Sequence, residues 1–485
     1  MNHLTPFTLI LATGLVNVSP AMAGGGIPLT NDDLNIETAI NSAGSVLDVL
    51  GNDDSGTGDN FKEVIAVCAT GTPDAMCTNN SYSNATGAVN INGAGDDNNV
   101  SFTSNSNTAA TFDFKYVMQN SAMNTGSAEV SAALNFIEVN ALSDAGNQTC
   151  DGTECTLREA FSYAANDGQP TTVKFRRDLT GTITLTAPLE VTSIDLTVQG
   201  PGPGQIAVSG DDSHRVLLVP ANSERFFLSG LSLTEGRTQG GQSGAGMLID
   251  GATDTQIENV KISGNVSAAS GGGLYVNNAG LSLTNSEISF NQAGLNGGGV
   301  GVAGGLGHDV TLENTTISHN LAGSQGDGIH INSNSGQNVL LRFVTAAFNG
   351  DQSEANRVGA NGNIIIEASV FSPLLTVLND NNIINNSIIE AYAGSDVLGD
   401  NNSLNVGGLL LSPLIEFNDA GVAVHSFGPD SLLYNHVDDM AGNAGCGTLV
   451  VTDQVGNNRP VAGDCDAGAY EYNLANDVIW AFDFD

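Results

Sequence analysis

The middle of the chain alternates short apolar runs with turns rich in asparagine and glycine, in a repeating order. Within the runs, apolar and polar residues alternate with the period of two that is typical of β-strands, as in residues 281–283 and 310–312. The phrase Ile-Ser-x-Asn recurs at 262–265, 288–291 and 317–320, with a looser copy at 346–349. A glycine follows the first three asparagines by 8 residues (273−265, 299−291, 328−320), and the next asparagine follows after 18, 21 and 21 (291−273, 320−299, 349−328). One corner of the unit is therefore fixed in length, and the opposite side absorbs insertions.

This repeat predicts a solenoid in which each copy forms one coil. If the strands of successive coils lie about 4.8 Å apart, the recurring asparagines form one column in which each side-chain amide hydrogen-bonds the next: Asn265, Asn291, Asn320 and Asn349. A second column lies six residues earlier (265−259) and holds Asn259, Asn285 and Asn314. The glycines suit bends where φ is positive or a Cβ has no room. Two columns with one offset predict a parallel β-helix; the alternative is chance recurrence in a loop rich in asparagine and glycine.

Residues 24–138 differ in character and predict a small β-sandwich. Strand-like segments separated by turns occur near residues 64–68, 88–91, 111–117 and 132–139. The phrases at 49–54 (VLGNDD) and 112–117 (FDFKYV) resemble the cadherin-like and Ig-like modules of bacterial surface proteins. In some of those relatives the acidic loop holds structural calcium, so the resemblance implies Asp53, Asp54 and Asp59 as oxygen ligands. Acidic residues beside glycine in a turn are more often simply solvated.

A disulfide loop and a short helix are predicted at 139–170. Thr156 and Glu159 have the spacing of a capping box, in which hydroxyl and carboxylate each bond the other residue's backbone amide. The helix would cover the unpaired strand edge at the open end of the solenoid with one apolar face: Leu157, Ala160, Phe161 and Ala164. Residues 150–160 resemble the CSLREA motif of secreted bacterial β-helix proteins, with Thr156 in place of the usual serine. Arg158 and Glu159 are therefore interpreted as structural.

The solenoid is predicted to span residues 171–411, and its rhythm resembles the repeats of chlamydial polymorphic membrane proteins and of pectate-lyase-like β-helices. Residues 412–472 resemble the choice-of-anchor Q region found at the C-terminal end of such solenoids. The matching fragments are Ser412-Pro413-Leu414, Asp419-Ala420-Gly421, Asp453-Gln454, Arg459-Pro460 and 465–471. The resemblance implies a C-terminal cap, with Asp453, Arg459 and Glu471 as paired structural charges, followed by a tail at 473–485. The predicted fold class is all-β: a right-handed parallel β-helix with an N-terminal β-sandwich and a C-terminal cap.

Charge and cysteine content favour an exported protein. The net charge of −39, with only 13 Lys plus Arg, excludes nucleic acid as a partner, because phosphate binding needs basic side chains. The apolar run 7–16 and the small-x-small site Ala21-Met22-Ala23 predict a signal peptide at 1–23, although its first three residues carry no basic side chain. That run is too short to span a membrane, and we expect no transmembrane segment. Three local cysteine pairs predict disulfides and not zinc, since none has CxxC spacing: Cys68–Cys77, Cys150–Cys155 and Cys446–Cys465.

The register of the coils also predicts which side chains share the outer face. One outward column holds Glu258, Thr284, Glu313 and Arg342, and another holds Lys261, Glu287 and Thr316. Glu258 and Glu313 are two coils apart, about 9.6 Å between backbones, which approaches the carboxylate separation of an inverting glycosidase. Opposite charges on adjacent coils, however, ordinarily stabilise a sheet.

Other features of the sequence argue against an enzyme. Lys261 is the only basic residue between Thr238 and Leu341, and the motifs of polygalacturonase-type hydrolases are missing. His308, His319 and His330 are spaced by 11 (319−308, 330−319), so they are not expected to stack. We expect no catalytic residue, and no cofactor or metal apart from the calcium considered above.

The sequence therefore favours a secreted, structural or adhesin-type protein at the outer cell surface or in the extracellular space. Surface glycans or proteins are the expected partners, bound by the loops that absorb insertions: residues 277–280, 303–309 and 332–338. The alternative is a carbohydrate-active enzyme (a polysaccharide lyase, hydrolase or epimerase) on the outer face of the same scaffold.

Overall fold

The computed structural model describes residues 28–472 with internal gaps. The gaps are 29, 56–60, 95–98, 107, 148, 194, 305–307, 334–336, 351–354, 361–362, 378–381, 391, 395–401, 405, 407–408, 417–420, 428–429, 438–449 and 460–463. The predicted signal peptide (1–23) and tail (473–485), together with Asp59 and Cys446, lie outside the described residues.

The N-terminal region consists of two sheets that meet across an aromatic core. One sheet runs β1–β8–β7–β3, with β1 and β8 parallel, and the other runs β2–β6–β5–β4. Phe102 of β6 and Phe112 of β7 are buried, with ring centroids 5.1 Å apart. The predicted disulfide Cys68–Cys77 joins β3 to the loop that follows the short 3-10 helix Asp74–Met76. The strands are β1 (Asp33–Ala39), β2 (Ala43–Leu47), β3 (Glu63–Cys68), β4 (Ser81–Ser83), β5 (Gly87–Ile91), β6 (Val100–Ser104), β7 (Ala110–Gln119) and β8 (Thr125–Val139). The assignment of this region to a cadherin- or Ig-like module stays a prediction.

A short helix covers the beginning of the solenoid, as the capping box predicts. In α1 (Leu157–Asp167), the Glu159 amide donates to the Thr156 hydroxyl (3.2 Å) and the Thr156 amide donates to the Glu159 carboxylate (2.8 Å). The predicted apolar face of α1 is buried. The predicted disulfide Cys150–Cys155 closes the loop immediately before the helix.

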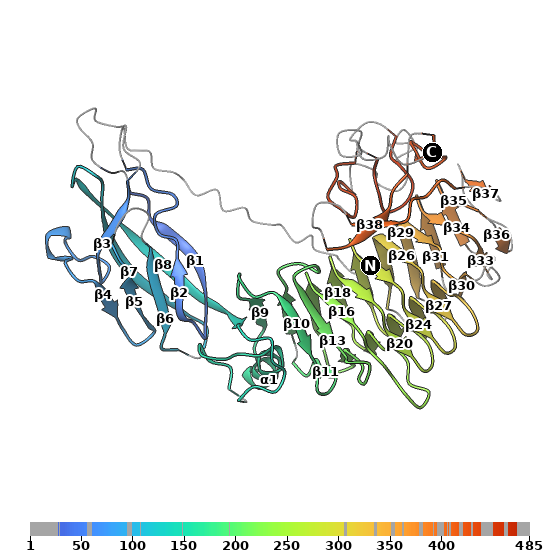
Figure 1. The fold of residues 1–485 in the computed structure, drawn as a ribbon, viewed down its shortest axis with the longest axis horizontal. Helices are drawn as coiled ribbons and strands as arrows, with labels where there is room; N and C mark the ends of the chain where they lie inside the picture. Colours follow the sequence, from blue (N-terminus) through green and yellow to red (C-terminus); the bar gives the residue numbers. More distant parts are fainter. Residues whose placement is uncertain are drawn as a thin grey trace, which may run out of the picture.

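The coils that follow form a parallel β-helix, which confirms the predicted all-β solenoid fold (Figure 1). Strands pair in parallel with the equivalent strand of the next coil, as in Leu274↔Val300↔Ile329. The first coils contain β9 (Thr171–Phe175), β10 (Gly181–Thr184), β11 (Leu189–Glu190), β12 (Asp195–Gln199), β13 (Ile206–Ser209), β14 (Leu217–Pro220), β15 (Arg225–Ser229), β16 (Ser232–Thr234) and β17 (Met247–Asp250). The central coils contain β18 (Asp254–Glu258), β19 (Lys261–Ser263), β20 (Val266–Ser267), β21 (Leu274–Asn277), β22 (Leu281–Thr284), β23 (Glu287–Ser289), β24 (Gln292–Ala293), β25 (Val300–Gly304), β26 (Val310–Ser318), β27 (Leu321–Ala322) and β28 (Ile329–Ser333). The last coils contain β29 (Asn338–Ala347), β30 (Asn356–Ala360), β31 (Asn363–Glu367), β32 (Val370–Phe371), β33 (Leu375–Val377), β34 (Asn382–Asn385), β35 (Ile388–Ile389), β36 (Tyr392–Gly394) and β37 (Ser403–Leu404).

The predicted asparagine ladder runs through the central coils. The side-chain amide of Asn265 donates to the Asn291 carbonyl oxygen (2.9 Å), and the same bond joins Asn291 to Asn320 and Asn320 to Asn349 (3.0 Å each). Each acceptor also receives the backbone amide of the preceding ladder residue. All four side chains are buried, so these bonds replace water for groups that would otherwise be costly to bury.

The second column has a different physical basis from the ladder. Asn259, Asn285 and Asn314 have φ values of 50°, 51° and 47°, in the left-handed region that asparagine tolerates better than most residues. Asn314 also donates to Asn285 through its side chain (3.2 Å). Asn259 lies between β18 and β19 and Asn285 between β22 and β23, whereas Asn314 lies at the equivalent position within the longer strand β26.

The C-terminal segment packs along the side of the coils (Figure 1). It begins with the antiparallel pair β38 (Leu414–Glu416) and β39 (Ala423–His425). The Ala423 amide donates to the Glu287 carboxylate (2.7 Å), and the Ala469 amide donates to the Thr345 hydroxyl (2.9 Å). The segment expected to close the solenoid therefore has its described contacts on the lateral wall. Its choice-of-anchor assignment stays a prediction.

We expect Asn320→Ala to lower the free energy of unfolding by about 3 kcal/mol. The substitution removes the shared acceptor of the Asn291 backbone and side-chain amides and the side-chain donor to the Ile288 carbonyl oxygen, at about 1–3 kcal/mol for each buried group left without a partner. Asn277→Ala is the matched control, because Asn277 makes its side-chain bond to Asp250 in an exposed position, where about 0.5 kcal/mol is the usual scale. Urea unfolding of the three proteins measures the difference; equal losses for the two variants would contradict a buried ladder.

Candidate functional site

The first predicted outward column exists and carries an ion-pair network. The register runs Glu258↔Thr284↔Glu313↔Arg342 and continues to Glu367. Arg342 bridges two coils, with its guanidinium 3.3 Å from the Glu313 carboxylate and 3.0 Å from the Glu367 carboxylate. Burial raises the pKa of Glu313, and Arg342 opposes that rise. Glu367 was missed from the sequence because the rhythm becomes irregular after residue 349. These pairs of opposite charges on adjacent strands stabilise the outer face of the coils.

The second predicted column also exists, but the C-terminal segment covers it. Lys261, Glu287 and Thr316 are in register on adjacent strands. Glu287 is fully buried and bonds both Lys261 (3.2 Å) and the Ala423 amide. The Thr316 hydroxyl donates to the Gln454 side chain (2.7 Å). These side chains therefore hold the segment in place.

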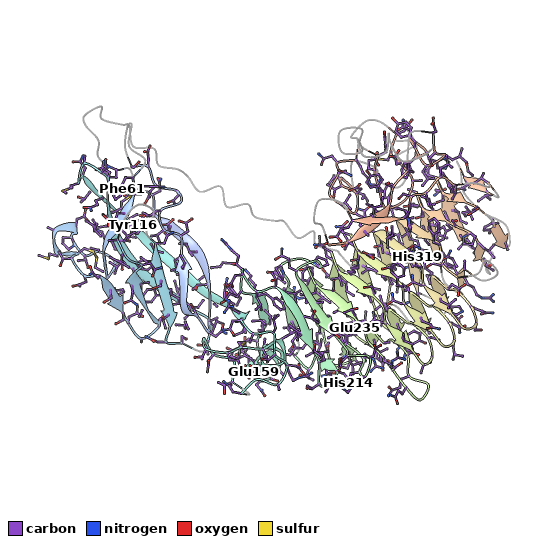
Figure 2. All side chains as sticks on the ribbon, in the orientation of Figure 1. Phe61, Tyr116, Glu159, His214, Glu235 and His319 are labelled. Atoms are coloured by element: carbon purple, nitrogen blue, oxygen red, sulfur yellow. A yellow bond between two sulfur atoms is a disulfide. The ribbon has the colours of Figure 1, made fainter. Side chains whose placement is uncertain are left out.

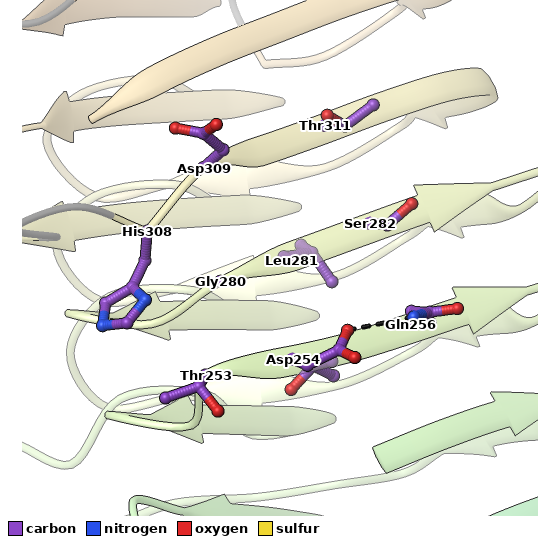
Figure 3. Close-up of a pocket in the computed structure, with 10 residues that line it drawn as sticks. Thr253, Asp254, Gln256, Gly280, Leu281, Ser282, His308, Asp309 and Thr311 are labelled. Atoms are coloured by element: carbon purple, nitrogen blue, oxygen red, sulfur yellow. Dashed lines mark hydrogen bonds between the residues drawn. The ribbon is translucent and has the colours of Figure 1, made fainter. Parts of the chain in front are cut away.

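A shallow hollow crosses the outer face between β18 and β26; we call it the central trough (Figure 3). Its floor is formed by Gly280, immediately before β22, and by the outward Ser282 of β22, and the longer side chains along β18 and β26 form its rims. Asp254 and Asp309 lie on opposite rims, with Gly280 between them. The trough has a volume of about 510 Å³ and is lined by Thr253, Asp254, Thr255, Gln256, Gly280, Leu281, Ser282, His308, Asp309 and Thr311. Two of the loops predicted to bind a partner, 277–280 and 303–309, end at this trough.

The rim carboxylates are held by local hydrogen bonds. The Gln256 amide donates to Asp254 (3.0 Å), as Figure 3 shows. Asp309 accepts both the backbone amide (3.1 Å) and the side-chain amide (3.0 Å) of Asn338 on the next coil. The carboxylates of the trough are therefore oriented, and Asp309 is exposed to solvent.

His308, His319 and His330 were not expected to stack on one another, and they occupy different surroundings. His308 lies in the trough, and His330 is in register with Gly301 on another sheet. His319 lies in the central coils (Figure 2). Its ring is sandwiched between Phe290 and Phe348, with ring centroids 4.7 Å and 5.6 Å away. All three residues of this stack have a positive φ, immediately before the ladder asparagines.

A serine lies between two histidines beneath the C-terminal segment. The Ser318 hydroxyl is 2.7 Å from His319 Nδ1 and 2.7 Å from His425 Nε2, while His425 Nδ1 is 2.7 Å from the Ser412 carbonyl oxygen. Because a carbonyl oxygen only accepts, His425 Nδ1 carries the proton and Nε2 accepts from Ser318. The geometry is that of an activated nucleophile, yet Ser318 is 0% exposed and His425 1% exposed. No substrate atom has access, so the group fastens the segment to the coil. Sequence reasoning missed it because His425 lies 107 residues from Ser318.

Two of the three predicted structural charges of the C-terminal segment, Arg459 and Glu471, form an ion pair. The Arg459 guanidinium is 2.8 Å from Glu471 and lies over the Phe343 ring, with Cζ 3.7 Å from the centroid. It also donates to Asn314 (3.1 Å), a residue of the second asparagine column. Asp453 accepts the Glu471 amide (2.9 Å). A buried cation thus joins the segment to the wall, and burial raises the pKa of Glu471 to about 7.

Asp53, one of the candidate calcium ligands of the N-terminal region, is engaged with protein groups. Asp53 accepts the Tyr116 hydroxyl (2.5 Å) and the Asn31 amide (2.8 Å). Asp59 lies outside the described residues, and in the part of the chain that is described no three His, Cys, Asp or Glu side chains are arranged to hold a metal ion. Burial and the nearby Asp53 raise the pKa of Asp33 to about 7, and Asp33 has a buried carboxylate oxygen without a partner.

Comparison with known proteins finds one similar structure. The chain matches no family model and no curated protein sequence. It is similar to a solved structure titled "Crystal structure of pectate lyase Pel9A", at 14% identity and a TM-score of 0.41, over 70% of this chain and 97% of that one. Among the described residues, no helix is long and apolar enough to cross a membrane. The architecture defines a parallel β-helix protein, and its function is to be inferred from its own side chains.

We expect Asp33→Asn to stabilise the protein at pH 8 and to have little effect at pH 4. Asp33 has a raised pKa in the folded state, so the folded protein favours its protonated form, and stability falls as pH rises from about 4 to about 7. The amide of asparagine does not ionise, so the variant does not lose stability in this way as pH rises. Urea midpoints at the two pH values measure it, with Asp113→Asn on the exposed face of β7 as the control. A variant less stable than wild type at pH 8 would contradict this interpretation.

We expect the C-terminal segment to loosen as pH falls from about 6.5 towards 4, through His425. Burial lowers the pKa of His425 to about 4, so its contribution to stability is present at neutral pH and is lost on acidification. Asp466 and Glu471, whose pKa values are raised, change stability in the opposite direction. The measurement is therefore the difference between wild type and His425→Gln in limited proteolysis of residues 412–472 at pH 7 and pH 4.5. A variant with the same pH dependence as wild type would refute the role of His425.

Proposed function

We propose that this protein is an exported, non-catalytic rod of structural or adhesin type that presents its outer face to glycans or proteins outside the cell. Two disulfides support an oxidising compartment, and the excess of acidic side chains keeps such a rod soluble. The proposed division is a signal peptide (1–23), a sandwich module (24–138), a capping region (139–170), the solenoid (171–411), a C-terminal module (412–472) and a tail (473–485).

The observation that carries this proposal is the neutralisation of the reactive groups on the outer wall. Arg342 is shared between Glu313 and Glu367, so neither carboxylate is free to act as a base. The Ser318–His425 pair is buried under the C-terminal segment. The polar groups that line the trough are hydroxyl, amide and carboxylate groups and the imidazole of His308, and all of these can hydrogen-bond a ligand.

A carbohydrate-active enzyme is the second candidate, and one observation favours it. Glu258 and Glu313 share a column with one strand between them, which places their backbones about 9.6 Å apart. Asp254 and Asp309 repeat that arrangement across the trough. A general acid of this kind normally needs an apolar environment, which the solvent-exposed Asp309 lacks.

We expect the mature protein to bind at least one oligosaccharide on a glycan array without cleaving it. Incubation with each bound glycan should yield neither new reducing ends nor unsaturated sugars, and Glu313→Gln should leave binding unchanged because Glu313 pairs with Arg342. Release of products that is abolished by Glu313→Gln would replace this proposal with the enzymatic one. Absence of glycan binding would remove glycans as the partner.

A further inference from the structure

The central trough owes its shape to one coil with short outward side chains. This coil offers Gly280, just before β22, and Ser282 of β22. The coil before it has Asp254 and Gln256 of β18 at these positions, and the coil after it has Asp309, just before β26, and Thr311 of β26. The rims are two strand spacings apart, about 9.6 Å between backbones. The hollow therefore runs across the solenoid axis, with His308 at the end where the strands begin (Figure 3).

The lining of the trough matches the chemistry of sugar hydroxyls. Oriented carboxylates on both rims accept hydrogen bonds from hydroxyl groups, and such charge-assisted bonds are stronger than neutral ones. The Ser282 and Thr311 hydroxyls and the Gln256 amide both donate and accept. A polyhydroxylated chain lying along β22 would thus meet a carboxylate and a group that both donates and accepts on each side, and the Ser282 hydroxyl below.

The charges around the trough oppose an anionic ligand. Both rims carry a carboxylate, and the nearby cations are already occupied. Arg225, one strand before Asp254, makes two bonds to Asp195 (3.0 and 2.6 Å). Arg342, one strand after Glu313, is shared by two glutamates. A uronate or sulfated sugar would bring negative charge against Asp254 and Asp309 without a free cation from either arginine, and repulsion of this kind produces specificity.

We propose that the central trough binds a segment of a neutral glycan and discriminates against acidic glycans. The inference rests on the proposed binding function and adds its location and ligand class. The trough also lies where two insertion-bearing loops end, so variation in those loops would alter the ligand without disturbing the ladder.

The test uses the full-length mature protein and an array of neutral and uronate-containing oligosaccharides, read in EDTA so that cations do not bridge carboxylates. Titration calorimetry with the best neutral ligand then compares wild type with Ser282→Trp, which fills the floor. The matched control is Thr197→Trp, which alters the same outward column three strands earlier. We expect at least about tenfold weaker binding for Ser282→Trp and no change for Thr197→Trp, with circular dichroism showing that both remain folded.

The role of the two rim carboxylates in excluding acidic glycans is tested separately with the double variant Asp254→Asn and Asp309→Asn. We expect it to gain binding to oligogalacturonate, while wild type binds only neutral ligands. A wild-type preference for uronates, or equal binding by Ser282→Trp and wild type, would overturn the trough proposal and leave the adhesive role of the rod intact. Cleavage of the bound glycan would instead overturn the proposed function. Binding to no glycan at all would overturn the trough proposal and leave proteins as the partners of the rod.

Discussion

The fold depends on burying a column of side-chain amides whose spacing equals the spacing of the coils. A solenoid stacks each strand on its equivalent, so any polar group inside a corner must be satisfied by the same residue one coil away. Asn265 through Asn349 meet that condition with both a side-chain and a backbone donor for each acceptor. The register that results also aligns the outward columns, so the trough and the ion pairs follow from the buried ladder.

The outward side chains of the lateral wall lie in two different environments. Where the C-terminal segment lies, outward groups such as Glu287 and Ser318 are buried and become internal hydrogen-bonding groups. Where the segment is not in contact, around Ser282, equivalent positions face solvent and form the trough. The same type of strand thus serves packing or recognition, and the route of the C-terminal segment decides which.

Sequence reasoning predicted the features that depend on periodicity or on close neighbours. The ladder, the two outward columns, the capping box at Thr156 and the local disulfides all follow from spacing alone. It missed the features that depend on distant packing, because nothing local marks them. Gln454 meets Thr316 and Ala423 meets Glu287 across 138 and 136 residues. The trough was missed because it arises from side-chain length on three strands together, and Glu367 because its coil departs from the repeat.

Strand β8 belongs to both the N-terminal region and the solenoid. It pairs with β7 and β1 along most of its length, and its last three residues, Ile137 to Val139, pair with β9 of the first coil. A boundary drawn at residue 138 therefore falls inside a hydrogen-bonded strand. Mechanical load on the N-terminal region would pass into the coils through that backbone, and turning the region about its junction would require breaking the sheet. The N-terminal region is therefore connected to the coils through a continuous sheet, and the twist of that sheet sets its direction relative to the coils.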